Sequence, residues 1–102
     1  MQEFIAAKRE EIAELCRRHH VRRLAVFGSA ARDDFDPARS DVDVIVEFDD
    51  MPIEEYASNK WALLDELTDK FARKVDLLTW NSIQNPYFMD VIQRSYQTVY
   101  GD

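Results

Sequence analysis

Three aspartates lie in or beside segments whose alternation and apolar content predict strands. Asp41 and Asp43 are two residues apart in the alternating run 41–48, so their carboxylates should project from one face, about 6–7 Å apart at the Cα atoms. Asp76 is the second residue of another apolar run, 75–80. If the two strands are neighbours, three carboxylates meet on one patch, where their like charges repel unless a cation lies between them.

A divalent cation with oxygen ligands suits such a patch. Mg²⁺ prefers carboxylate and phosphate oxygens, and two ions about 3.5–4 Å apart can activate a hydroxyl and stabilise a leaving pyrophosphate. We therefore expect Asp41, Asp43 and Asp76 to be catalytic residues and metal ligands for a pair of Mg²⁺ ions. The alternative for Asp41 and Asp43 is a solvated strand face. The alternative for Asp76 is an ion pair with Lys74 or Arg73.

A turn with the features of a phosphate-binding loop precedes these aspartates. Gly28 ends the strand predicted over Val21–Phe27 and lets the backbone turn with no side chain between it and a ligand. Ser29 offers a hydroxyl and an N–H beside a predicted helical turn, and Arg32, one turn later, could reach the same phosphates with its fork of donors. We expect all three to bind nucleotide phosphates. The alternatives are an ordinary strand-ending turn and a surface arginine.

The elements that must position these residues follow from hydrophobic periodicity and turn signals. The pattern predicts helices over 2–19, 53–72 and 85–95, strands over Val21–Phe27, 41–48, 75–80 and Gln97–Tyr100, and a polar loop over 33–40. In the helix 53–72 the expected apolar stripe is Trp61, Leu64, Leu67 and Phe71. This order of elements predicts a small mixed α/β sheet with helices packed on one face.

Composition narrows the classes of protein. The chain has 102 residues, 46% of them hydrophobic, and 20 acidic against 13 basic residues give a net charge of -7. An acidic surface argues against direct nucleic-acid binding. The lone Cys16 excludes a disulfide scaffold, and two glycines are too few for a dinucleotide fingerprint or a P-loop. With no apolar run of about 20 residues and no signal-peptide core, we expect a single domain over 1–102, cytoplasmic and away from membranes.

Together these motifs resemble a known signature. Gly28-Ser29, eleven residues, then Asp41-Val42-Asp43, with Asp76 on a later strand, is similar to the signature of polymerase-β-type nucleotidyltransferases. The stretches 27–32, 40–46, 74–78 and 85–100 most resemble the minimal nucleotidyltransferases, the antitoxins of HEPN–MNT toxin–antitoxin pairs. There are two departures. The spacing between Ser29 and Asp41 is one residue longer than the commonest ten, and a glycine expected just before Arg73 is Ala72.

The resemblance implies a fold, an activity and a partner. It implies a polymerase-β-like core in which Gly28 and Ser29 bind the triphosphate of ATP, and Asp41 and Asp43 hold Mg²⁺. Asp76 would complete the site and serve as base for the attacking hydroxyl. The implied reaction is transfer of AMP from ATP to a tyrosine of a cognate HEPN ribonuclease toxin, which silences it. The rival is a non-catalytic antitoxin that inhibits by binding alone; the intact set of three aspartates favours catalysis.

Several other residues have a structural and a functional interpretation. His19 and His20 are expected to close a helix C-terminus, where positive charge is favourable, and Cys16 is expected in the core. Tyr87 and Phe88 are expected mainly as packing residues. The alternative is that they form a patch facing a partner, together with Trp61.

Overall fold

The computed structural model describes residues 1–31 and 41–101. The elements along the chain are α1 (Glu3–Ala6), α2 (Arg9–Arg18), β1 (Val21–Phe27), the 3-10 turn η1 (Gly28–Ala30), β2 (Val42–Phe48), α3 (Ile53–Phe71), β3 (Val75–Thr79), the 3-10 turn η2 (Trp80–Ser82), α4 (Pro86–Ser95) and β4 (Gln97–Tyr100). The predicted strands are confirmed to within a residue. The predicted loop over 33–40 lies outside the described residues.

The first predicted helix is two helices. The prediction of one continuous helix over 2–19 is wrong because the backbone tightens between α1 and α2, where Lys8 N–H donates to the carbonyl of Ile5, three residues back (3.0 Å). A bond of that span belongs to a 3-10 turn, which cannot propagate an α-helical ladder. Both Ile5 and Ile12 still reach the core and are fully buried.

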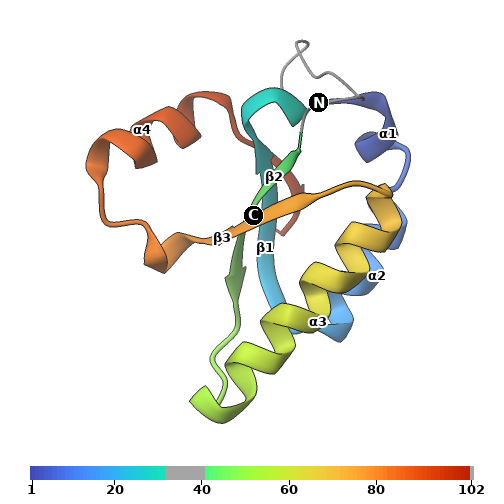
Figure 1. Cartoon of the computed structure of the whole chain (residues 1–102), viewed down its shortest axis with the longest axis vertical. Helices are drawn as coiled ribbons and strands as arrows, with labels where there is room; N and C mark the ends of the chain where they lie inside the picture. The colour runs from blue at the N-terminus through green and yellow to red at the C-terminus, as the bar shows by residue number, and fades with distance from the viewer. Residues whose placement is uncertain (32–40, 102) are drawn as a thin grey trace.

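The four strands form one mixed sheet in the order β3-β2-β1-β4 (Figure 1). β1 pairs antiparallel with β2 and with β4, whereas β2 and β3 run parallel. The connection from β2 to β3 is α3, as a parallel pair requires. The predicted mixed sheet is therefore confirmed, and β3 is an edge strand, with no partner strand on its outer side among residues 1–31 and 41–101.

One face of the sheet carries the larger core. Val42, Val44 and Val46 point to this face with period 2 and are fully buried against α1, α2 and α3. Cys16 lies in the same cluster, as predicted, and burial raises the pKa of its thiol to about 12. The stripe predicted for α3 is wrong at Trp61, which is 64% exposed. Leu63 takes that place, because Leu63, Leu67 and Phe71 repeat every four residues along the buried side.

The opposite face of the sheet is covered by α4, which the prediction of helices on one face missed. Ile92 of α4 is fully buried against Ala25, Phe27 and Ile45, which alternate with the residues of the first core. In Figure 1, α4 stands on the other side of the strands from α2 and α3. A short helix can cover either face of a sheet, so the local periodicity of its sequence does not indicate which face it covers.

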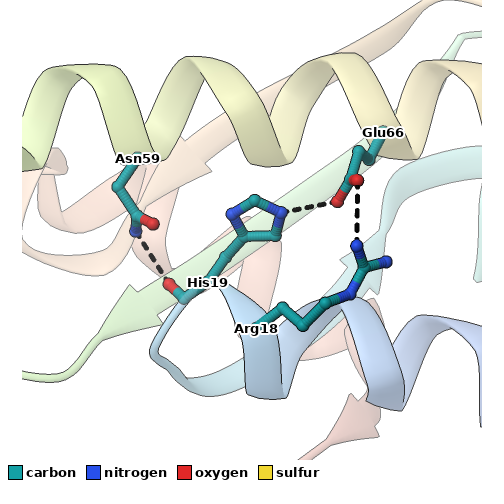
Figure 2. Close-up of polar contacts among 4 residues, drawn as sticks. All are labelled: Arg18, His19, Asn59 and Glu66. Atoms are coloured by element: carbon teal, nitrogen blue, oxygen red, sulfur yellow. Dashed lines mark hydrogen bonds and ion pairs between the residues drawn. The ribbon is translucent and has the colours of Figure 1, made fainter.

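The end of α2 is fastened to α3 by polar contacts (Figure 2). His19 caps α2, and its Nε2 donates to Glu66 Oε2 (2.5 Å), while Arg18 Nη1 donates to Glu66 Oε1 (3.3 Å). Asn59 Nδ2 donates to the carbonyl of His19 (2.7 Å). The structural interpretation of His19 is thus confirmed. No helix in the described part of the chain is long and apolar enough to cross a membrane.

Candidate active site

Two of the predicted aspartates are direct neighbours across the parallel strand pair. In the register of β2 and β3, Asp43 lies opposite Asp76. Adjacent strands are about 4.8 Å apart, and residues paired in this way project from the same face. That face is the one covered by α4, since Asp43 and Asp76 precede by two residues Ile45 and Leu78, which belong to the α4-side cluster. Asp76 is exposed because β3 is the edge strand.

Gly28 lies against the carboxylate of Asp43. Phe27 pairs with Asp43 across the antiparallel β1–β2 ladder, and Gly28 follows with φ +64. A Cβ placed on Gly28 would be 2.7 Å from Asp43 Oδ2, closer than a van der Waals contact allows. The absence of a side chain at Gly28 therefore does two things: it permits the left-handed turn and it leaves space beside an oxygen of Asp43.

Of the other two residues predicted to bind phosphates, the structure describes Ser29 but not Arg32. Ser29 is half-buried in η1, the single 3-10 turn that follows β1. Ala31 N–H donates to the carbonyl of Gly28 (3.1 Å), which closes this turn next to Asp43. Arg32 lies outside the described residues, so its predicted contact with phosphates stays a prediction.

Asp41 is placed differently from the other two aspartates. It precedes β2 by one residue, its side chain is 38% exposed, and its Oδ2 lies 3.7 Å from Lys74 Nζ. Lys74, the alternative ion-pair partner predicted for Asp76, lies with Asp41 instead. An exposed pair of this kind contributes at most about 1 kcal/mol, so a ligand with higher charge can displace the ammonium.

The arrangement suits a hard cation, although it is not a closed metal site. Within residues 1–31 and 41–101, no group of three or more His, Cys, Asp or Glu side chains is placed to hold a metal ion. Asp43 and Asp76 nevertheless provide oxygen donors of the type that Mg²⁺ prefers, with the space at Gly28 beside them. Because Mg²⁺ commonly takes one or two carboxylates plus phosphate oxygens, the pair fits an ion that arrives with a nucleotide.

A pocket of about 380 Å³ contains the two aspartates. It is lined by Phe27, Asp43, Asp76, Leu77, Leu78 and Phe88. Phe88 is not among the residues predicted for the site. Its position in the first turn of α4, shortly after β3, could have indicated that it lies near the site. The sequence did not reveal which face of the sheet α4 covers, so this position could not be interpreted. A second pocket, of about 260 Å³, is lined by Arg22, Asp49 and others at the opposite end of the sheet and holds none of the predicted site residues.

The chain is similar in sequence and in fold to several known proteins. A family model described as "Nucleotidyltransferase domain" matches residues 9–99. A Methanocaldococcus jannaschii protein named "Putative protein adenylyltransferase" is 36% identical over 91 residues, which span 81% of this chain and 89% of the relative. A solved structure described as a "putative minimal nucleotidyltransferase" is 29% identical with a TM-score of 0.69, covering 93% of this chain and 92% of that one.

A structure with lower sequence identity shares the fold. It is the tri-AMPylated Shewanella oneidensis HEPN toxin in complex with its MNT antitoxin, matched at 18% identity with a TM-score of 0.65 over 96% of this chain and 73% of that one. At this identity the likeness concerns the arrangement of helices and strands only.

Proposed function

Because this chain belongs to the nucleotidyltransferase domain family, we propose that it transfers AMP from ATP to a tyrosine of a cognate HEPN-domain ribonuclease toxin and thereby neutralises it. The observation that carries this proposal is the pairing of Asp43 with Asp76 beside the side-chain-free turn at Gly28. A protein acceptor is supported by the relative named as a protein adenylyltransferase. The HEPN toxin is supported by the complex whose antitoxin shares this fold.

Asp43 and Asp76 are the residues that would hold Mg²⁺, with Asp41 joining them when Lys74 is displaced. When bound, Mg²⁺ would neutralise charge on the triphosphate oxygens and make the attacking hydroxyl more acidic. Two carboxylates on adjacent strands supply the negative charge for such an ion. The family resemblance and the donor set support this assignment for all three aspartates.

The chain's own groups then have distinct tasks. The turn at Gly28 and Ser29, with Arg32, would bind and orient the triphosphate, since backbone N–H groups and a guanidinium suit phosphate oxygens. Asp76, the exposed member of the pair, would accept the proton of the tyrosine hydroxyl. The tyrosine oxygen bonds to the α-phosphorus, and the bond from that phosphorus to the bridging oxygen breaks. Pyrophosphate leaves with the electron pair, and AMP remains on the tyrosine.

One observation favours a second candidate function, a non-catalytic antitoxin that inhibits by binding alone. Lys74 lies 3.7 Å from Asp41, and an ammonium there can neutralise the carboxylate without a metal ion. In that case the acidic site would be a remnant, and inhibition of the toxin would need only the contact surface.

Mass spectrometry of the toxin separates the two functions. The protein, ATP and Mg²⁺ are incubated with the proposed HEPN-domain toxin, and each transfer should add about 329 Da to that toxin. Asp43→Asn and Asp76→Asn should each reduce the transfer at least a hundredfold, whereas Asp69→Asn, at an exposed position of α3, should leave it unchanged. Toxin inhibition with no mass change, and inhibition that survives Asp43→Asn with Asp76→Asn, would establish the binding-only function instead.

The same variants give a readout that does not depend on transfer. Mg²⁺ with a non-hydrolysable ATP analogue should raise the thermal midpoint of the parent protein, because a ligand that binds only the folded state stabilises it. Asp43→Asn and Asp76→Asn should lose most of this shift. Asp69→Asn should keep it. An equal shift in all three variants would exclude these aspartates as ligands.

A further inference from the structure

Three large apolar side chains are exposed on α4. Tyr87 is 82% exposed, Val91 57% and Phe88 42%. Tyr87 and Val91 are four residues apart and share one face of the helix. Phe88 lies between that face and the side of Ile92, four residues later, which anchors α4 to the sheet. We call these three residues the α4 patch. Single exposed apolar residues are ordinary, but an exposed cluster of this kind marks an interaction surface.

The α4 patch is continuous with the candidate active site. Phe88 belongs to the patch and also lines the pocket that contains Asp43 and Asp76. A chain lying on Tyr87 and Val91 would therefore extend directly toward the two carboxylates. A docking surface for an acceptor must have this property, because the acceptor hydroxyl has to reach the α-phosphate of a nucleotide bound in the pocket.

The first turn of α4 is held in place before any partner binds. Asn85 Oδ1 accepts hydrogen bonds from the N–H groups of Tyr87 (2.9 Å) and Phe88 (3.4 Å), and Pro86 occupies the first position of the helix. A capped N-terminus with proline at this position is preorganised. The two aromatic side chains of the patch thus project from a rigid backbone, which lowers the entropy cost of binding.

Charge decides which occupant fits. The chain has a net charge of -7, and the pocket next to the patch contains two carboxylates. A second copy would bring the same charge and the same carboxylates, so self-association through this face is opposed. A protein with an apolar surface and basic residues at its rim is favoured, because opposite potentials attract and orient the partner.

From this continuity and charge we infer that the α4 patch is the docking surface for the acceptor protein, with Tyr87 and Val91 contributing affinity away from the reacting atoms. This inference rests on the proposed function for the identity of the acceptor. The sequence suggested a partner-facing patch of Trp61, Tyr87 and Phe88, and the structure separates Trp61 from the other two. Trp61 lies on α3, whose buried side packs against the other face of the sheet, so Trp61 is not part of the α4 patch.

The test compares two variants that each replace two exposed apolar side chains by serine. The patch variant carries Tyr87→Ser with Val91→Ser, and the control variant carries Ile53→Ser with Trp61→Ser at exposed positions of α3. Titration calorimetry without ATP measures the affinity for the proposed HEPN-domain toxin. The patch variant should bind at least tenfold more weakly and the control should bind like the parent. Denaturant unfolding and the thermal shift with the ATP analogue should match the parent in both variants.

If the double variant is unstable, the single change Tyr87→Ser, at the most exposed position of the α4 patch, replaces it in the test. This change should weaken binding threefold or more. Unchanged affinity in the patch variant, or equal weakening in the control, would overturn the docking inference. A concentration-dependent dimer that the patch variant loses in sedimentation would assign the patch to a second copy and overturn it too. Mass spectrometry distinguishes the two proposals: binding through the patch without AMP transfer refutes only the proposed function, and transfer with an unchanged acceptor KM in the patch variant refutes only the docking inference.

Discussion

At the scale of single residues, the site depends on where a side chain is missing. Asp43 can offer an oxygen to a ligand because nothing projects from Gly28 into the space beside it. Glycine also permits the φ of +64 at this position, which an L-residue with a side chain adopts only at a cost of about 1–2 kcal/mol. The backbone conformation at position 28 and the open space beside Asp43 thus both require glycine. The neighbouring Ser29 could be replaced without backbone strain.

We predict that Gly28→Ala abolishes AMP transfer and lowers the free energy of unfolding by about 2 kcal/mol, because the added methyl group meets Asp43 Oδ2 in a strained backbone. Denaturant unfolding and the mass assay measure the two effects. Gly101→Ala is the matched control: Gly101 also has positive φ (+79), and its added Cβ would collide with the carbonyl of Arg22, at the far end of β1 from the site. That variant should lose stability but keep transfer per folded molecule. Full transfer by Gly28→Ala would contradict the role given to this turn.

At the scale of elements, the ends of α3 and β2 determine how the aspartates meet. α3 carries the chain from the end of β2 back to the start of β3, so that the parallel register can pair Asp43 with Asp76. Its last residue is followed by Ala72, which adopts a left-handed conformation with φ 53 and ψ 38. This is the position where family resemblance led us to expect a glycine, and the conformation explains why: left-handed residues after a helix are usually glycine.

Ala72→Gly should therefore stabilise the protein. Relief of the left-handed strain is worth about 1–2 kcal/mol, and the greater freedom of glycine in the unfolded chain costs about 0.4–1 kcal/mol, so a net gain of about 0–1.6 kcal/mol is expected. Ala57→Gly, at an exposed position inside α3, should instead cost about 1 kcal/mol. The midpoints of urea unfolding measure both, and a loss of stability in Ala72→Gly would refute the explanation.

At the scale of the whole molecule, the two faces of the sheet have different tasks. One face carries the large core with α1, α2 and α3, and the other carries α4, the pocket and the α4 patch. Stability and function are thereby separated: changes at the contacts between α2 and α3 should alter unfolding without altering nucleotide binding. The polar contacts of Glu66 with His19 and Arg18 (Figure 2) lie on the structural face and offer a direct test.

The hydrogen bond from His19, assisted by Arg18, holds the pKa of Glu66 below its ordinary range. A lowered pKa in the folded state means that the unfolded state binds the proton more readily, so the stabilisation is present above the ordinary pKa and is lost as pH falls through the folded value. The parent should therefore exceed Glu66→Gln in stability at neutral pH, and the difference should shrink below about pH 5. Unfolding curves across this range provide the measurement. A constant difference between the parent and Glu66→Gln across this range would contradict the role of the contact.

Much of the fold could be predicted from local patterns. Period-2 alternation located β2 within a residue, and Asn85 followed by Pro86 located the start of α4. Near-helical spacing of apolar residues predicts Trp61 on the buried side of α3, but that side is centred on Leu63 and Leu67. The break between α1 and α2 also went unpredicted, since neither glycine nor proline marks it.

What the sequence alone determined is the set of residue types and their short-range spacing: the glycine at the end of a strand, the acidic pair two residues apart, and a later strand with one more aspartate. These properties are local, because alternation and turn chemistry involve residues that are close in the chain. Only the tertiary structure decided that Asp43 meets Asp76, that Lys74 lies by Asp41, and that α4 places Phe88 in the pocket. Strand register and the choice of sheet face depend on contacts between distant segments, and a shift by one residue would turn every side chain of a strand to the opposite face.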